Sequence, residues 1–247
     1  MFRLRTLFAA IAALVFVATS ASAKVGCSLT TTYNSRPLFT NAGVYASKKT
    51  AQISDLYCAD AQSGLYFDVW NLMPFGPYVD GGEVDVRVGW TKRFGQLTLD
   101  GSVAEYDFHI RGLGQVDSFD GRFKATYDVL DSSSTFVLQP YVLLDYQKLL
   151  QGDLGYGDAL ALAGGAYAGV KLAPQVELGV TAGMWAYQYM WAPNHHATIR
   201  LIEPIVKLQA RKDLAFFFKV PITYGTIADP TDHQWRKSAV LGFTWSF

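Results

Sequence analysis

Apolar and polar residues alternate with a period of two along most of the chain beyond residue 24, and no stretch shows the 3.6-residue period of an amphipathic helix. Val84 and Val86 point to one face of their segment, whereas Asp85 and Arg87 point to the other. The segment 118–130 repeats this arrangement, with aromatic residues opposite charged ones. The pattern predicts an all-β chain whose sheet has one apolar face and one charged face.

The alternation predicts twelve strands, at 25–33, 49–58, 63–70, 82–92, 97–108, 118–130, 135–149, 158–172, 176–189, 198–210, 214–225 and 237–247. Short connectors are expected at 59–62, 93–96, 131–134, 173–175 and 211–213, and longer ones at 34–48, 71–81, 109–117, 150–157, 190–197 and 226–236. Short turns at one rim and longer loops at the other are typical of an up-and-down antiparallel transmembrane β-barrel. Strands of about 11 residues tilted by about 45° match its ~25 Å apolar band. A second interpretation starts a ten-stranded barrel at residue 63, with residues 24–62 as a periplasmic extension.

The carboxyl terminus carries a distinctive pattern. Ala239, Leu241, Phe243, Trp245 and Phe247 share one face of the last strand, and the chain ends on an aromatic residue. Outer-membrane barrels commonly end in this way, and the strand resembles the signal that their assembly machinery reads. We therefore expect this machinery to be a partner of the chain. Closure into a barrel also pairs the backbone groups that an open sheet would expose to hydrocarbon.

The amino terminus has the features of an export signal. Two arginines precede an apolar core at 7–18, and small residues lead to an expected cleavage after Ala23. The sequence thus predicts a signal peptide at 1–23 and one barrel domain at 24–247. A retained membrane anchor is the alternative, but an apolar run of about 12 residues is short of the ~20 that a spanning helix needs. A lipid anchor on Cys27 lacks the expected preceding sequence.

Composition narrows the class further. Half of the residues are apolar and 17% are charged, which excludes a disordered chain. The 21 basic and 21 acidic residues give no net charge, which argues against a nucleic-acid-binding protein. The mean hydropathy is +0.12, yet no apolar run beyond the leader approaches the ~20 residues of a spanning helix, so we exclude a helical membrane protein.

The two cysteines are predicted to form a disulfide. Cys27 begins the first predicted strand and Cys58 ends the second, so antiparallel pairing brings both to the periplasmic rim. An exported protein meets an oxidising compartment in which such a bond persists. Two unpaired thiols are the alternative, and a ten-stranded barrel would give the cysteines no reason to meet.

The charged face of the predicted strands would line a lumen with mixed charge. Its members are Asp85, Arg87, Asp100, Arg122, Lys124, Asp128, Glu177, Glu203, Lys207 and Lys219. Small residues on the same face, including Ala161, Ala163 and Gly165, are expected to leave room. The alternative is a salt-bridged plug that fills the interior. Eight strands fill with side chains and sixteen leave an aqueous channel, so twelve strands alone do not decide between the two.

The four histidines are candidates for catalytic or metal-binding groups. His109, His195, His196 and His233 lie in or beside predicted loops, where a solvated side chain is the ordinary reading. A lipid hydrolase would need His195 or His196 with Thr198, or His233 with Asp232, and no serine lies at the spacing expected for such a pair. Two adjacent histidines form a weak metal site, and no glycine-rich turn opens a helix. We expect no cofactor, no metal and no enzymatic activity.

One region resembles a known family. The run GLYFDVWN at 64–71 and the run GGEVDVRVGWTKRFGQLTLDGSVAEYDF at 81–108 look like the TorF-like porin family, as does TTTYNSRPLF at 30–39. Pro37 follows Arg36 where the resemblance predicts glycine. The resemblance covers about a third of the mature chain and implies a small outer-membrane barrel with passive transport.

Together these patterns predict a barrel in the outer membrane of a Gram-negative bacterium, in contact with membrane lipid and lipopolysaccharide. Its predicted function is that of a narrow passive diffusion pore for small solutes, with selectivity set by the lumen charges. One alternative is a structural or adhesion barrel that acts through its extracellular loops. A second alternative is an outer-leaflet lipid hydrolase.

Overall fold

The computed structural model describes residues 25–39, 44–45, 50–75, 82–110, 114–131, 133–149, 158–189, 196–226, 231 and 233–247. Regular structure in these ranges consists of β-strands, and they hold no helix long and apolar enough to cross a membrane. The predicted signal peptide lies outside the described residues.

The strands follow the predicted alternation closely. They are β1 (Val25–Asn34), β2 (Leu38–Phe39), β3 (Val44–Tyr45), β4 (Ala51–Asp60), β5 (Leu65–Pro74), β6 (Gly82–Phe94), β7 (Leu97–Ile110), β8 (Gly114–Tyr127), β9 (Phe136–Leu149), β10 (Ala159–Ala173), β11 (Val176–Tyr189), β12 (Ala197–Arg211), β13 (Leu214–Lys219), β14 (Ile222–Tyr224), β15 (Trp235–Lys237) and β16 (Val240–Ser246). The pair β2–β3 is a small separate hairpin within the predicted loop 34–48.

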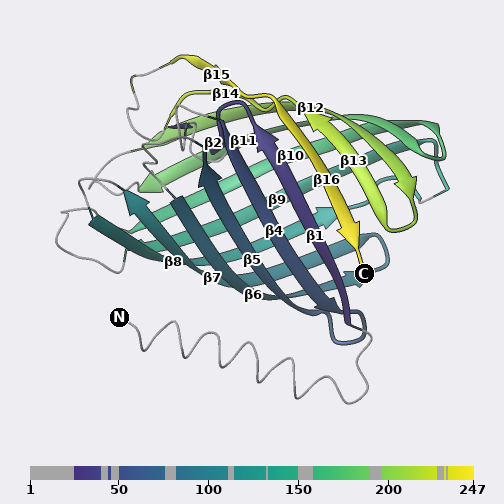
Figure 1. The fold of residues 1–247 in the computed structure, drawn as a ribbon, viewed down its shortest axis with the longest axis horizontal. Coiled ribbons are helices and arrows are strands. Elements are labelled where there is room, and N and C mark those ends of the chain that lie inside the picture. The colour runs from purple at the N-terminus through teal and green to yellow at the C-terminus, as the bar shows by residue number, and fades with distance from the viewer. Residues whose placement is uncertain are drawn as a thin grey trace.

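The remaining strands close into a barrel. Each strand from β4 to β12 pairs antiparallel with the next, β1 pairs with β4 and β16, and β13 joins β16 to β12. With β13–β14 and β15–β16 each counted as one wall strand, the barrel has twelve strands, which confirms the prediction. The ten-stranded interpretation is wrong, because β1 and β4 are part of the wall. Figure 1 shows the C-terminus at the end of the barrel where short turns lie, which marks this end as periplasmic.

Two predicted strands are interrupted, and two predicted loops are shorter than expected. The first of these loops, predicted at 71–81, starts later because β5 continues to Pro74. The strand predicted at 214–225 breaks at Pro221, which has no N–H to donate to the ladder, yet the register with β12 is the same on both sides of the break. The last wall strand breaks at 238–239. The connector predicted at 109–117 shrinks to 111–113, because β7 and β8 continue their pairing up to Ile110 and Gly114.

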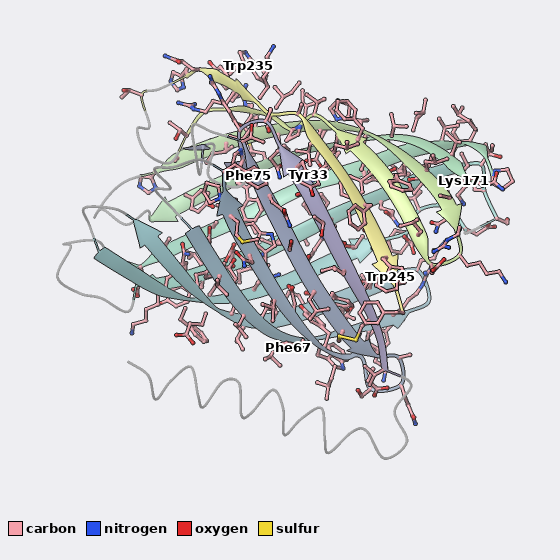
Figure 2. All side chains as sticks on the ribbon, in the orientation of Figure 1. Tyr33, Phe67, Phe75, Lys171, Trp235 and Trp245 are labelled. Atoms are coloured by element: carbon pink, nitrogen blue, oxygen red, sulfur yellow. A yellow bond between two sulfur atoms is a disulfide. The ribbon has the colours of Figure 1, made fainter. Side chains whose placement is uncertain are left out.

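The two faces of the wall differ as the alternation requires. On β10 the outward Leu162 is 61% exposed, whereas its neighbour Ala163 is 2% exposed. Exposed apolar side chains recur at alternate positions on most wall strands, among them Phe123, Val142, Val206, Phe218 and Leu241. Figure 2 places Tyr33, Phe75 and Trp235 toward one end of the barrel and Phe67 and Trp245 toward the other. An apolar belt between aromatic rims is the outer surface of an outer-membrane barrel.

Glycines allow inward-facing rings to lie against the wall. A Cβ at Gly179 would lie 2.2 Å from the Tyr167 hydroxyl oxygen, and one at Gly89 would lie 2.3 Å from the Tyr66 ring. Phe217 covers Gly242 in the same way, with a ring atom 2.4 Å from the Cβ position. These glycines therefore provide the space that the aromatic side chains occupy.

Arginine on the outer face is expected to destabilise the barrel far more than arginine on the inner face. Phe123→Arg would place a charge in the apolar belt and should lower the free energy of unfolding by about 2–4 kcal/mol near the bilayer midplane. Thr126→Arg, on the inward face of the same strand, should have a milder effect. Urea unfolding in lipid vesicles measures both variants. Equal losses would contradict the assignment of faces.

Candidate functional site

A cluster of buried ion pairs lies inside the barrel on the wall formed by β5 to β9. Arg87 Nη1 lies 2.9 Å from Asp68 Oδ2, and Arg122 Nη2 lies 2.9 Å from Asp145 Oδ2 and 3.4 Å from Asp120 Oδ2. We call these five residues the central ion cluster. Arg87 is directly opposite Asp68 in the register, and Arg122 is directly opposite Asp145. Side chains directly opposite on one face of adjacent strands are in contact range, so sheet geometry itself forms these pairs.

The hydroxyl of Tyr106 links the two arginines. It accepts hydrogen bonds from Arg87 Nη2 at 3.4 Å and from Arg122 Nη2 at 3.5 Å. The cluster is well shielded from solvent, since the Arg122 side chain is 21% exposed and the side chains of Asp145 and Asp120 are 8% and 2% exposed. In such a site each guanidinium compensates carboxylates that could not otherwise remain charged.

Further acids lie on the same wall toward the extracellular end. Glu83 and Asp85 are buried on the inward face of β6, and Asp55 faces inward from β4. Each of them has a buried carboxylate oxygen without a hydrogen-bond partner among the described residues. This half of the inner wall is therefore rich in acid, and the two arginines of the central ion cluster are its nearest compensating bases.

Lysine and glutamate line the inner wall formed by β11 to β13. Lys207 Nζ lies 2.8 Å from Glu177 Oε1 and donates to the Tyr167 hydroxyl at 3.2 Å, and Tyr167 itself donates to Glu177. Lys219 Nζ lies 3.1 Å from Glu203 Oε2. A cavity of about 450 Å³ opens beside these pairs near the periplasmic end, and Ile205, Phe217 and Lys171 contribute to its lining.

The other predicted lumen residues lie on the wall of the central ion cluster, toward its periplasmic side, or at the periplasmic rim. Asp100 accepts a hydrogen bond from the Tyr66 hydroxyl at 3.1 Å, and its register partner Lys124 lies 5.1 Å above the centre of the Tyr141 ring. Asp128 follows the end of β8 and pairs with Arg93 at 2.7 Å, where the Arg93 side chain is 59% exposed. Asp128 therefore belongs to the periplasmic mouth.

Burial along the inner wall shows where the interior is narrow. Toward the extracellular end, inward residues such as Leu72, Ala161 and Ile199 are almost completely buried. The expected room beside the small residues of β10 is not present, because the Tyr141 hydroxyl lies 2.8 Å from the Cβ position of Gly165 and neighbouring side chains cover Ala161 and Ala163. Inward side chains are more exposed toward the periplasmic end, where the cavity lies.

Sequence reasoning missed some members of the site. Asp68, Asp120 and Asp145 share the central ion cluster with the predicted Arg87 and Arg122 but were absent from the predicted lumen residues. The parity of each strand could have identified them, since every second residue from a known inward position also faces inward. Asp145 stands alone in an apolar run, so its strand shows little visible alternation.

The histidines do not assemble a recognisable centre in the described part of the chain. The His233 ring stacks on Tyr224 at 5.9 Å, and His196 is exposed just before β12. His195 and Asp232 lie outside the described residues, as does the side chain of His109. Among the residues that the structure describes, no group of three or more His, Cys, Asp or Glu side chains is placed to hold a metal ion.

The closed antiparallel wall, its apolar outer belt and its charged interior define an outer-membrane β-barrel of the Gram-negative type. No protein-family model and no curated protein matches the sequence. Solved structures do match the fold. The KdgM porin in complex with disordered oligogalacturonate is 9% identical, with 89% of this chain and 99% of that chain covered and a TM-score of 0.57.

Two further structures show the breadth of this likeness. The NanC porin is 12% identical over 89% of this chain and 98% of its own, with a TM-score of 0.57. The β domain of the Bordetella autotransporter BrkA is 14% identical over 92% of this chain and 100% of its own, with a TM-score of 0.55. Because porins and autotransporter domains both match at such low identity, the likeness establishes the fold alone. The function has to be inferred from the residues that line the lumen.

Proposed function

We propose that the chain is a narrow passive diffusion pore for small solutes, with its constriction at the central ion cluster. The observation that carries the proposal is that charged side chains line both facing inner walls of the barrel. Arg87 and Arg122 lie among the acids of β4 to β9, while lysine–glutamate pairs line the facing strands beside an open cavity. Charged side chains around a constriction select ions and polar solutes by their charge.

The charge balance favours neutral or cationic solutes. Beyond the ion pairs, the inner wall carries Asp55, Glu83 and Asp85, whereas the lysines of β12 and β13 are matched by glutamates. KdgM was solved with oligogalacturonate, a polyanion. The acid-rich wall of this chain argues against a solute of that kind. The resemblance to TorF-like porins and the likeness to the two porins support passive transport as such.

The last strand supports a further part of the proposal. Leu241, Trp245 and Phe247 are exposed on the outer face, and Phe243 shares this face. These four residues form the proposed signal for the barrel assembly machinery. The expected signal peptide at 1–23 would deliver the chain to that machinery through the periplasm.

Single-channel recording in planar bilayers tests the pore. The purified mature protein should give steady, small conductance steps in potassium chloride. Protein that is folded in the bilayer but never conducts would refute the proposal.

The pore should select by charge at the level of Asp100 and Lys124, which are direct register neighbours on the inner wall. Lys124→Gln should shift the reversal potential in a salt gradient toward cation preference, because it removes the inward base nearest to Asp100. Asp100→Asn is the matched control and should shift the reversal potential in the opposite direction. If neither change moves the reversal potential of a conducting protein, the pore does not select by charge at the level of this pair.

A structural or adhesion barrel that acts through its loops is the second candidate. The near-complete burial of Leu72, Ala161 and Ile199 toward the extracellular end favours it, because this half of the interior is packed. Absence of conductance, together with surface binding that is lost when the loops are shortened, would support this candidate. The lipid hydrolase remains the weaker alternative, since His196 and His233 are not assembled with a serine nucleophile in the described residues.

A further inference from the structure

A cationic and aromatic patch lies on the outer face of the barrel at the extracellular end of β12, β14 and β15. Arg200, Tyr224 and Trp235 are direct neighbours across these three strands. The Arg200 guanidinium lies 5.8 Å from the centre of the Tyr224 ring, which lies 4.9 Å from the Trp235 ring and 5.9 Å from the His233 ring. With Lys237, an exposed base two residues beyond Trp235, these residues form what we call the rim patch.

The rim patch faces away from the lumen. Leu201 and Thr223, which alternate with Arg200 and Tyr224, are buried on the inward side. Arg200 is exposed, Trp235 is 61% exposed, and Figure 2 shows Trp235 at the edge of the barrel outline. An arginine that points out of a membrane barrel must lie at the level of the lipid headgroups, because an arginine on the lipid face near the midplane would cost about 2–4 kcal/mol.

The outward residues next to the rim patch also place it at the level of the lipid headgroups. Further along β12, toward the periplasmic end, Ile202, Val206 and Leu208 are exposed on the outward face. This strip is part of the apolar belt and suits acyl chains. A lipid lying against the wall would therefore place its tails on the strip and its headgroup on Arg200 and the neighbouring rings.

Charge identifies the headgroup. Among the described residues, the Arg200 guanidinium contacts the Tyr224 ring and has no carboxylate in salt-bridge range. A guanidinium forms two parallel hydrogen bonds with a phosphate, and an aromatic ring beneath it holds its plane in position. Lys237 adds a second positive charge on the outer face, diagonal to Tyr224. A phosphate group has the charge and geometry that suit this arrangement.

We propose that the rim patch binds a phosphate group of lipopolysaccharide in the outer leaflet. The proposal rests on the position of the chain in the outer membrane and is independent of the pore function. Arg200 and Lys237 contact the phosphate, Tyr224 and Trp235 lie against the sugar at the interface, and the strip on β12 takes an acyl chain. The lipid is thereby held at one site on the barrel wall.

Native mass spectrometry of the folded protein in detergent tests the site with bisphosphorylated lipid A as the probe. Wild-type protein should retain one lipid A at low ratios, and the double variant Arg200→Gln, Lys237→Gln should bind it at least about tenfold more weakly, which is the expected loss of charge-assisted hydrogen bonds. Lys92→Gln is the matched control. Lys92 is an exposed base on the outer face of β6, beyond Trp90 and at the opposite, periplasmic end.

Three outcomes separate the alternatives. A phosphate site predicts that the wild type binds dephosphorylated lipid A only weakly. This binding should be as weak as the binding of bisphosphorylated lipid A to the double variant. Equal binding of both lipids, or equal losses in Lys92→Gln and the double variant, would overturn it. Competition by inorganic phosphate at the same strength as lipid A would show a free-anion site and likewise overturn the lipid proposal. Trp235→Leu changes the same patch but keeps both bases, so it should weaken lipid A binding less than the double variant does. A general disturbance of the fold at the rim would instead weaken binding in both variants alike.

Discussion

Replacing Arg122 with methionine should lower the free energy of unfolding by about 3–5 kcal/mol, which is the usual effect of breaking a buried ion pair by removing one partner. The guanidinium of Arg122 compensates both Asp120 and Asp145, whose side chains are nearly inaccessible to solvent. Methionine preserves much of the volume, so the loss reports on charge and hydrogen bonds. Urea unfolding of the folded barrel in lipid vesicles provides the measurement.

Arg93→Met is the matched control for this prediction. Arg93 pairs with Asp128 at 2.7 Å, a distance close to that of the Arg122–Asp145 pair, but its side chain is 59% exposed at the periplasmic mouth. An exposed ion pair contributes about 0–1 kcal/mol, so the control should change stability little. Similar small losses in both variants would mean that water reaches the central ion cluster freely, which contradicts a narrow constriction there.

A combined variant connects stability with conduction. Arg122→Met together with Asp145→Leu replaces both partners of the pair by apolar residues and should recover part of the lost stability. If the cluster is the constriction of a pore, this variant should also alter the single-channel conductance. Recovered stability with no change of conductance would place the constriction at another level.

The architecture of the barrel was predictable because apolar and polar residues alternate along nearly every strand. A lipid-facing position must be apolar, and its neighbour faces the other side, so the segment around Val84 and Asp85 defines both faces. The break at Pro221 could be suspected from the residue itself, since proline cannot donate to a ladder. The continuation of β7 and β8 beyond the expected ends had no such signal, because pairing outside the membrane does not require an apolar face.

The interior was less predictable than the wall. Parity gives the side of the wall on which Arg122 lies, but its pairing with Asp145 depends on the register between β8 and β9, which the sequence leaves open. The same limit explains the wrong expectation of room beside Gly165. Its neighbour across the sheet is Tyr141, and the tyrosine occupies the space that the glycine provides. Register, rather than composition, decides what fills a lumen.

Removal of the disulfide should also destabilise the barrel strongly. Cys27 and Cys58 are joined in the structure and lie directly opposite each other in the β1–β4 ladder. Cys27 also exchanges two backbone hydrogen bonds with Phe247, at 2.8 and 2.9 Å, so the bond lies where the first and last strands close the barrel. A crosslink that spans 31 residues restricts the unfolded chain, and the chain-entropy model gives a loss of about 3–4 kcal/mol when it is removed.

The double variant Cys27→Ser, Cys58→Ser should therefore unfold at lower urea concentration than the oxidised wild type, while reduced wild-type protein should match the variant. Reductant should have no effect on the variant itself, which controls for other actions of the reagent. Mass mapping under non-reducing conditions should show the two cysteine peptides joined in the purified mature protein. Since antiparallel pairing of β1 with β4 puts the two cysteines opposite each other, free thiols at both positions of folded protein would contradict this register at the closing seam.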